Sequence, residues 1–375
     1  MPTRFGRFIS GKHFSKLFLL LYILFMCFAA YETNNALCLL TGQSHLYGTV
    51  YIIFTVAAIL IMTKKSISLK WPNRTFKKIL SFLSCFYIYY LITLLLWELL
   101  CLIIRPTVTA RAIGTIGAFV MAVLIVLLGY LHTKFIKVKP YHISLENGEN
   151  EYRVALISDI HLGVFVGEKH VQRMVRKLNA LNSDLVVISG DIFDVDNSLL
   201  KDPVQLKHIS KLFSKIKTKE GVYAVVGNHD PEISDKTFKH FLKTAKINLL
   251  DNDIKELSRI TLVGRTDDAN NERKDLADIL PATESSKPIV VLDHKPENIN
   301  EDITGGADIV LCGHTHQGQM FPITLFTKWA NGKDCFYGHT VTDNAHSIVT
   351  SGIGFFELPM RLGTSNEIVD IVLRI

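Results

Sequence analysis

The distribution of apolar residues divides the chain into two parts. Before residue 133 lie four long runs without Lys, Arg, Asp or Glu, at about 17–31, 46–63, 79–97 and 112–131. From residue 153 the apolar runs shorten to four to six residues and alternate with segments of helical spacing, such as 167–182. We therefore expect a helical domain over 1–132, a linker over 133–152 and an α/β domain over 153–375.

The long runs predict membrane-spanning helices, because a span needs roughly 20 mostly apolar residues. We expect four spans, at about 17–36, 46–63, 79–104 and 112–132. The first run leaves a second interpretation open. Basic residues followed by an apolar stretch and Phe28-Ala29-Ala30 also resemble a secretory signal peptide that is removed.

The basic residues predict the orientation of these spans. Thirteen Lys and Arg residues lie before the first run, between the second and third, and after the fourth, whereas the alternate loops hold Arg105 and Arg111. This asymmetry favours a multi-pass protein of the cell membrane with residues 153–375 on the cytoplasmic side. It also accounts for the net charge of +6, so we expect the lipid bilayer as a partner and no nucleic acid.

The six cysteines form no CxxC pair, which argues against a zinc ribbon or a redox site.

Polar residues follow five of the short apolar runs directly, as expected for parallel strands whose carboxyl ends meet at one site. The runs are 153–158, 184–189, 222–226, 288–292 and 308–311, and the residues that follow are Asp159 and His161, Asp191, Asn228 with His229 and Asp230, His294, and His314 with His316. Glycines 190, 227 and 313 precede ligand candidates, where a missing Cβ permits close approach of the backbone. Carboxylate, imidazole and amide groups are suitable ligands for divalent metals.

This ordered set of clusters resembles the calcineurin-like metallophosphoesterase superfamily. The pieces GHTHQGQ (313–319) and SGIGFFELPMRLGTSNEI (351–368) resemble its membrane-associated, YkuE/YaeI-like branch. The resemblance covers about residues 150–375. It implies a four-layer α/β/β/α sandwich and hydrolysis of phosphoric ester or pyrophosphate bonds at two divalent metals.

The resemblance also implies roles for individual residues. One metal is expected on Asp159, His161, Asp191 and His316, and the second on Asp191, Asn228, His294 and His314, so that Asp191 bridges them. His229 is expected to be catalytic and not a ligand, stabilising or protonating the leaving oxygen. Mn²⁺ is the expected metal, with Fe, Zn, Mg and Ca as alternatives.

Other positions keep more than one interpretation. Asn228 and His229 are also candidate substrate contacts, and Arg361 is either a contact to the substrate phosphate or part of a structural ion pair. Asp230 is expected to cap its loop. Asp293 and Gln317 depart from the branch pattern, and Asp293 either orients His294 or weakens metal binding.

Four spans exceed what an anchor requires, which favours a substrate delivered at the membrane surface, such as a phospholipid or a nucleotide-linked lipid. The aromatic segment 321–338, next to His316, is expected to form a pocket rim or to touch the membrane. Hydrolysis of a soluble nucleotide by a tethered enzyme is the alternative within the same chemistry. A metal-binding sensor or transport component without catalysis is the alternative of a different class.

Overall fold

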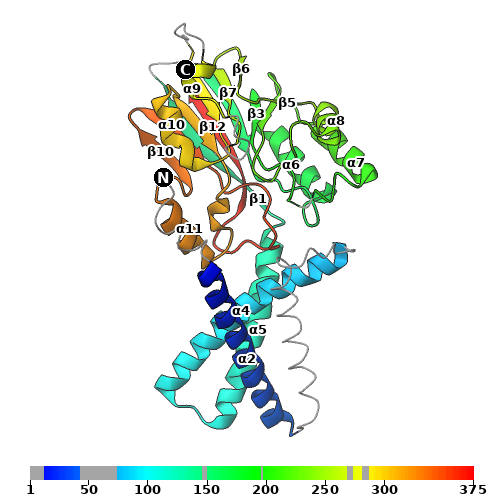
Figure 1. Cartoon of the computed structure of the whole chain (residues 1–375), viewed down its shortest axis with the longest axis vertical. Helices are drawn as coiled ribbons and strands as arrows, with labels where there is room; N and C mark the ends of the chain where they lie inside the picture. The colour runs from blue at the N-terminus through cyan, green and yellow to red at the C-terminus, as the bar shows by residue number, and fades with distance from the viewer. Residues whose placement is uncertain (1–11, 43–73, 146–149, 196, 268–272, 281–286) are drawn as a thin grey trace. The chain divides into compact units, whose positions relative to one another are not determined.

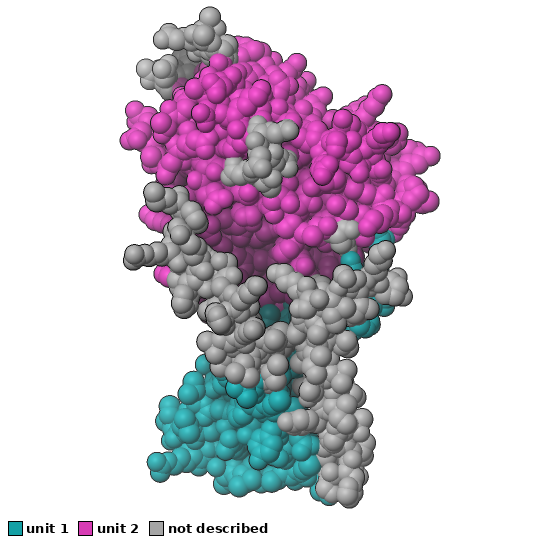
Figure 2. All heavy atoms as spheres, viewed as in Figure 1, with its two compact units in different colours: residues 1–128 teal, residues 129–375 magenta. Residues whose placement is uncertain are grey.

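The computed structural model describes residues 12–42, 74–145, 150–195, 197–267, 273–280 and 287–375. The chain forms two compact units, residues 1–128 and 129–375, which are coloured separately in Figure 2. The expected span at 46–63 lies outside the described residues.

The first unit is helical in its described part. It contains α2 (Lys12–Thr41), α4 (Arg74–Ile104) and most of α5 (Val108–His132). Both α4 and α5 are long and apolar enough to cross a membrane, and they cover the expected spans at 79–104 and 112–132. The expected span at 17–36 falls within α2.

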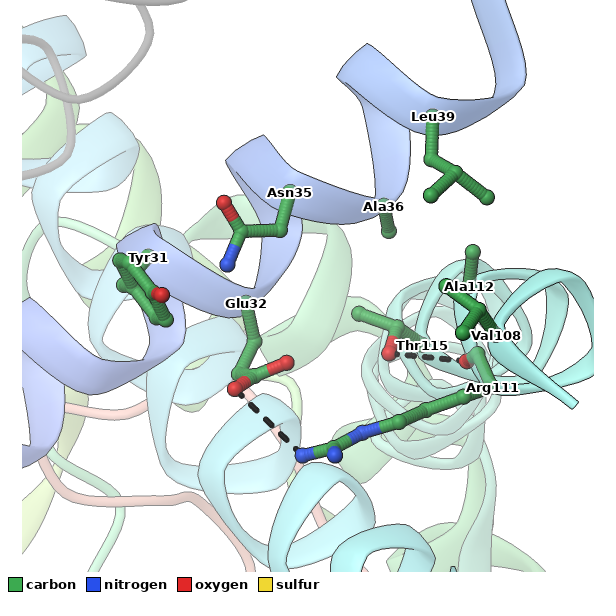
Figure 3. Close-up of a pocket in the computed structure, with 9 residues that line it drawn as sticks. All are labelled: Tyr31, Glu32, Asn35, Ala36, Leu39, Val108, Arg111, Ala112 and Thr115. Carbon is green, nitrogen blue, oxygen red and sulfur yellow. Dashed lines mark hydrogen bonds and ion pairs between the residues drawn. The ribbon is translucent and has the colours of Figure 1, made fainter. Parts of the chain in front are cut away.

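A polar cluster lies among the apolar residues of the first unit. Arg111 Nη2 lies 2.5 Å from Glu98 Oε2 and 3.6 Å from Glu32 Oε1. Figure 3 shows Arg111 and Glu32 in a cavity of about 240 Å³ between α2 and α5. Pairing lowers the cost of holding charged side chains among apolar helices.

The second unit is built on two six-stranded sheets, both of which mix parallel and antiparallel pairs (Figure 1). In spatial order, the first sheet consists of β1 (Ile136–Ser144), β12 (Asn366–Arg374), β2 (Glu151–Ile157), β3 (Leu185–Ser189), β4 (Val222–Val225) and β5 (Ile247–Leu249). The second consists of β10 (Gly338–Thr342), β11 (Ala345–Val349), β9 (Ile309–Cys312), β8 (Ile289–Leu292), β7 (Thr261–Gly264) and β6 (Asp253–Glu256). All five strands expected to precede the polar clusters are therefore present.

Helices cover the two sheets, and Figure 1 shows α6, α7 and α8 together at one side of the strands. Besides the end of α5, the α-helices in the described part of this unit are α6 (Glu168–Leu181), α7 (Pro203–Phe213), α8 (Lys236–Ala245), α9 (Leu276–Ile279), α10 (Ile299–Thr304) and α11 (Ile323–Asn331). The helix expected over 167–182 is α6, and its five apolar residues at helical spacing are all buried.

Three apolar clusters hold these elements together. One packs α6, α7 and α8 against the first sheet, through residues such as Ile157 and Ile188. A second lies between the sheets, where Leu156 of β2 and Leu292 of β8 are fully buried. The third packs α9 and α10 against the second sheet. Alternate residues of β2 thus enter different clusters, as the period of two along a strand requires.

The expected linker at 133–152 is corrected by the structure. Residues 136–144 form β1, which pairs in parallel with β12 from Ile136 opposite Asn366 to Ser144 opposite Arg374. The strand lies at the edge of its sheet, where Pro140 and exposed lysines are tolerated because one side of an edge strand makes no ladder bonds. These residues made the segment resemble a linker.

Candidate metal centre

The candidate ligands come together where strands of both sheets end. Strands β2, β3 and β4 run parallel in one sheet, and β8 and β9 run parallel in the other. The Ser189 hydroxyl at the end of β3 donates to the carbonyl of Leu311 in β9 at 2.9 Å, which joins the two sheets at this edge. The loops that follow these five strands therefore share one location.

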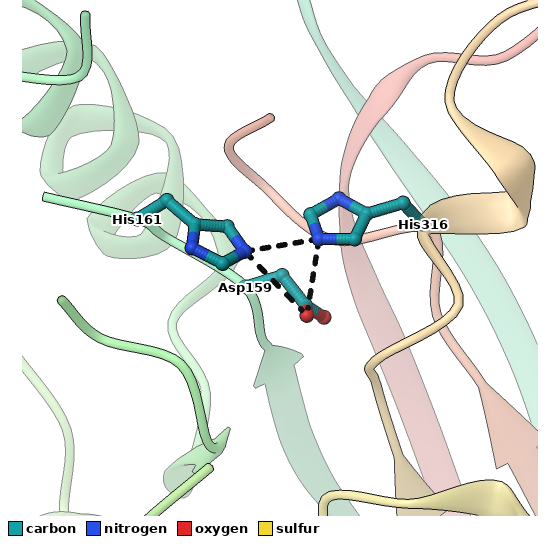
Figure 4. A group of neighbouring side chains, drawn as sticks. All are labelled: Asp159, His161 and His316. Carbon is teal, nitrogen blue, oxygen red and sulfur yellow. Dashed lines mark hydrogen bonds and ion pairs between the residues drawn. The ribbon is translucent and has the colours of Figure 1, made fainter. Parts of the chain in front are cut away.

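One group of converging ligand atoms consists of Asp159, His161 and His316, shown in Figure 4. The two imidazole Nε2 atoms lie 3.0 Å apart, and Asp159 Oδ1 lies 3.4 Å from that of His316 and 4.0 Å from that of His161. All three side chains are buried.

A second group consists of Asp159, Asp191 and His294. Asp191 Oδ2 lies 3.3 Å from His294 Nε2 and 3.7 Å from His161 Nε2, so this carboxylate faces both groups. Asn228 Oδ1 lies 3.2 Å from His294 Nε2. Asp159 belongs to both groups of converging ligand atoms, whereas Asp191 belongs to the second and approaches the first through His161.

His314 is close to this centre but placed differently. Its ring meets that of His294 edge-on, with centroids 5.1 Å apart. Its backbone N–H donates to both carboxylate oxygens of Asp159, at 3.0 and 3.1 Å. The groups of converging ligand atoms found among the described residues do not include the His314 imidazole.

The donor set fits divalent cations. Burial lowers the pKa of His161 to about 3 and holds that of His316 well below its ordinary value, so both imidazoles are neutral and present lone pairs. Burial also favours a neutral His294, but the charge of Asp191 outweighs it and raises the pKa of His294 to about 10. The positive charge of His294 compensates the buried carboxylates here, and a divalent metal would supply that charge in its place.

The backbone at the ligands is held in a rarely populated conformation. Left-handed φ angles of 51–71° occur at Asp159, His161, Asp191, His314 and His316. Such conformations cost free energy for residues with a side chain and collect at functional sites. Gln317, which departs from the branch pattern, is also left-handed at φ 54°, a conformation that favours glycine.

Three glycines permit the close packing of the ligands, as expected. A Cβ atom at Gly313 would overlap Ser158 Oγ and Asp159 Oδ2, and one at Gly227 would overlap Asp191 Oδ1. At Gly190 it would lie 2.6 Å from His294 Nδ1.

His229 lies at the edge of the centre, with its side chain 23% exposed. Its backbone N–H donates to Asp191 Oδ1 at 2.9 Å, and its Nε2 lies 4.0 Å from Asp191 Oδ2. The imidazole stacks on Phe356, with ring centroids 4.8 Å apart. Phe356 was missed as a functional residue, although it lies in the segment 351–368 that carries part of the resemblance.

Loop contacts around the ligands settle two of the open interpretations. Asp230 accepts hydrogen bonds from the N–H groups of Phe193 and Gly227, so it fixes its loop as expected. Asp293 pairs with Arg273 at 2.7 Å. The orientation of His294 is set instead by the hydrogen bond of its Nδ1 to the Ser189 carbonyl, at 2.8 Å.

The expected substrate contact at Arg361 is corrected by the structure. This side chain has no exposed surface. Its guanidinium donates to Asn366 Oδ1 and to the carbonyls of His316, Ser351 and Gly354, at 2.6–3.0 Å. Arg361 is thus a structural residue, which was the alternative interpretation. It acts through hydrogen bonds to carbonyl groups and not through an ion pair.

The class of this domain follows from its similarity to known proteins. Residues 152–318 match the family model described as calcineurin-like phosphoesterase. The chain therefore carries a calcineurin-like metallophosphoesterase domain, the class that acts on phosphoric esters.

Particular relatives extend this similarity. A zebrafish (Danio rerio) transmembrane protein with metallophosphoesterase domain is 33% identical over 60% of this chain and 54% of its own. An uncharacterized metallophosphoesterase of Helicobacter pylori is 32% identical over 64% of this chain and 66% of its own. The chain thus spans between half and two thirds of the length of these relatives. A solved archaeal phosphodiesterase matches at 16% identity over 52% of this chain and 82% of its own, with a TM-score of 0.31.

We predict that Gly313→Ala loses bound metal, because the added methyl group displaces the Asp159 carboxylate. Gly167→Ala is the matched control, since nothing lies within 4 Å of a Cβ atom there. Metal content of the purified variants, measured by elemental analysis, checks this. Full metal occupancy in Gly313→Ala would contradict the close packing described here.

Proposed function

We propose that this protein is a membrane-anchored, metal-dependent hydrolase of a phosphodiester or pyrophosphate bond in a lipid or nucleotide-linked lipid. One observation carries the choice of substrate: an apolar pocket of about 370 Å³ opens beside His314 and His316. Its apolar lining comes from Met320, Ile323, Phe356 and Leu358.

The proposed metal ligands are Asp159, His161, Asp191 and His316 for one cation, and Asp191, Asn228, His294 and His314 for the other. Two bound divalent cations, Mn²⁺ in this proposal, supply positive charge to phosphoryl oxygens and lower the pKa of water toward neutrality. The protein contributes a fixed, buried set of oxygen and nitrogen donors at the ends of its strands.

His229 is the proposed catalytic residue. Its imidazole is partly exposed beside the ligands, and both the stack on Phe356 and the backbone bond to Asp191 hold it in place. From this position it can donate a proton or a hydrogen bond to the leaving oxygen of a docked phosphoester.

Helix α11 supports a lipid substrate. It has no buried residues, and Leu325 and Trp329 are each 61% exposed. Neighbouring large apolar side chains, Phe321 and Phe326, are also exposed. A concentrated exposed apolar surface marks a site that contacts an apolar partner. Next to the metal ligands, such a surface suits an acyl chain.

The pocket's charge also distinguishes lipid from nucleotide. The lining residues of this pocket all belong to the described part of the chain. Glu357 is the one carboxylate among them, and they include no Lys or Arg. A polyphosphate extending into this pocket would be repelled, whereas an apolar leaving group would not. This favours the lipid substrate over the soluble nucleotide.

We also propose the finer architecture expected from the resemblance. The three apolar clusters support the layer order helices, sheet, sheet, helices. The excess of basic residues in alternate loops supports four spans and a cytoplasmic second unit.

The orientation is tested by a reporter fused after Ile375 in intact cells. We expect a reporter that is active only in the cytoplasm to be active, and protease added outside to leave residues 150–375 intact. An exported reporter would show that the topology is inverted.

We predict that His229→Ala keeps its metals but loses about 10²–10⁴-fold in turnover, the usual contribution of a general acid. Elemental analysis and steady-state kinetics on one preparation separate the two effects. Asp191→Asn is the comparison, since it removes the carboxylate that faces both ligand groups and should lose metal as well as turnover. A metal-free His229→Ala protein would make His229 a ligand.

The substrate class is tested with two compounds that share a pyrophosphate. We expect the full chain with Mn²⁺ to cleave CDP-diacylglycerol with a kcat/KM at least about tenfold higher than that for CDP-glycerol. The reason is that burial of an acyl chain in the pocket stabilises the bound lipid. Ile323→Gln, in the pocket, should lower only the lipid value, and Val204→Gln, at an exposed site on α7, should change neither. A preference for CDP-glycerol would support the nucleotide alternative, and no cleavage of either would count against both.

A further inference from the structure

A second hollow in residues 129–375 has a different character from the metal centre. It measures about 190 Å³ and lies between the segment that follows α5 and one face of α6. Its lining residues, here called the basic pocket, are Lys134, Phe135, Ile136, Arg173, Arg176 and Lys177. Four of these six residues carry a positive charge, and none carries a negative one.

The charges of the basic pocket are not neutralised by the protein. Within the described part of the chain, none of its four cations forms an ion pair with a carboxylate. Lys134 Nζ lies over the ring of Tyr130, 3.8 Å from its centroid, and Arg173 Nε is buried without a hydrogen-bond partner. The excess of like charge in one hollow is unfavourable until an anion enters it.

The positive charges of the basic pocket also lower the pKa of a neighbouring histidine. His170 lies on α6, one turn before Arg173, and its Nδ1 is 3.4 Å from Arg173 Nη2. Burial, together with the charges of Arg173 and Lys134, lowers the pKa of His170 to about 4.

The place of the basic pocket in the chain points to the bilayer. Lys134 follows the end of α5, at His132, by two residues, which span at most about 7 Å. Among the described residues, helix α5 is one of two helices that are long and apolar enough to cross a membrane. Phe135, beside Lys134, is 67% exposed. Cations and aromatic side chains at the end of an apolar helix are typical of the headgroup region.

We infer that the basic pocket binds the phosphate of an anionic membrane lipid, at a site separate from the metal centre. The exposed Phe135 favours a lipid over a free anion, because it offers an apolar surface next to the charges. The inference requires that α5 spans the membrane, and it does not require that the protein hydrolyses anything.

Binding can be measured on the full chain in detergent by native mass spectrometry. The probes are palmitoyl-oleoyl phosphatidylglycerol and the phosphatidylcholine with the same acyl chains, which differ in net charge. Glycerol 1-phosphate serves as a soluble competitor that carries the phosphate without the chains.

Each variant removes two positive charges, either from the basic pocket or, in the control, from a surface outside it. The double variant Arg173→Gln/Arg176→Gln removes two charges of the basic pocket. The double variant Arg176→Gln/Lys177→Gln also removes two of its charges, but at two exposed positions, where packing is not disturbed. Lys207→Gln/Lys211→Gln is the matched control, with both lysines exposed on α7. Metal content and the thermal unfolding transition verify that each variant is folded.

We expect the wild-type chain to bind its first phosphatidylglycerol at least about tenfold more tightly than phosphatidylcholine. Both pocket variants should lose this preference and keep their metals, whereas the control should retain it. Glycerol 1-phosphate should not displace the lipid. Equal affinity for the two lipids, a preference that survives in the pocket variants, or displacement by glycerol 1-phosphate would each overturn the inference. A loss of hydrolysis alone would bear only on the proposed function.

Discussion

The burial of two carboxylates at the junction of the sheets is the constraint on which the second unit depends. Asp159 and Asp191 have almost no exposed surface. Burial and the neighbouring Asp191 raise the pKa of Asp159 to about 6, although the charge of His294 opposes them. The backbone N–H groups of His314 and His229 compensate part of the desolvation by donating to these carboxylates. Since the donors come from other loops, the loops must fold around the carboxylates.

This constraint explains the backbone of the centre. Ligands brought this close leave no room for a Cβ atom at Gly227 or Gly313, and several of them adopt left-handed φ angles. The unfavourable conformations persist because hydrogen bonds from distant segments hold them. Arg361 is one such support, since it binds the carbonyl of the ligand His316 and two carbonyls of the loop 351–354.

The sequence predicted the strands and the ligand clusters because both are local signals. A buried strand is a short apolar run, and a ligand after it stands out as polar. The edge strand β1 was missed, since its exposed lysines and Pro140 carry no apolar alternation. The role of Arg361 was left open because the full burial of a guanidinium depends on carbonyls that only the fold brings together. Phe356 was missed for the same reason: its stack on His229 joins two loops far apart in the chain.

The second unit presents two surfaces of opposite character, and their separation has a physical basis. A phosphate in the basic pocket is held by Lys and Arg, which attract an anion without reacting with it. At the metal centre the protein supplies carboxylates and imidazoles, and the adjoining pocket is apolar with Glu357 at its rim. Without bound cations, this centre is a poor site for a phosphate, because Asp159 and Asp191 repel it. Productive binding of a phosphoester there is therefore tied to metal loading, whereas binding in the basic pocket is not. A lipid headgroup can thus be held in the basic pocket whether or not the metal centre is loaded.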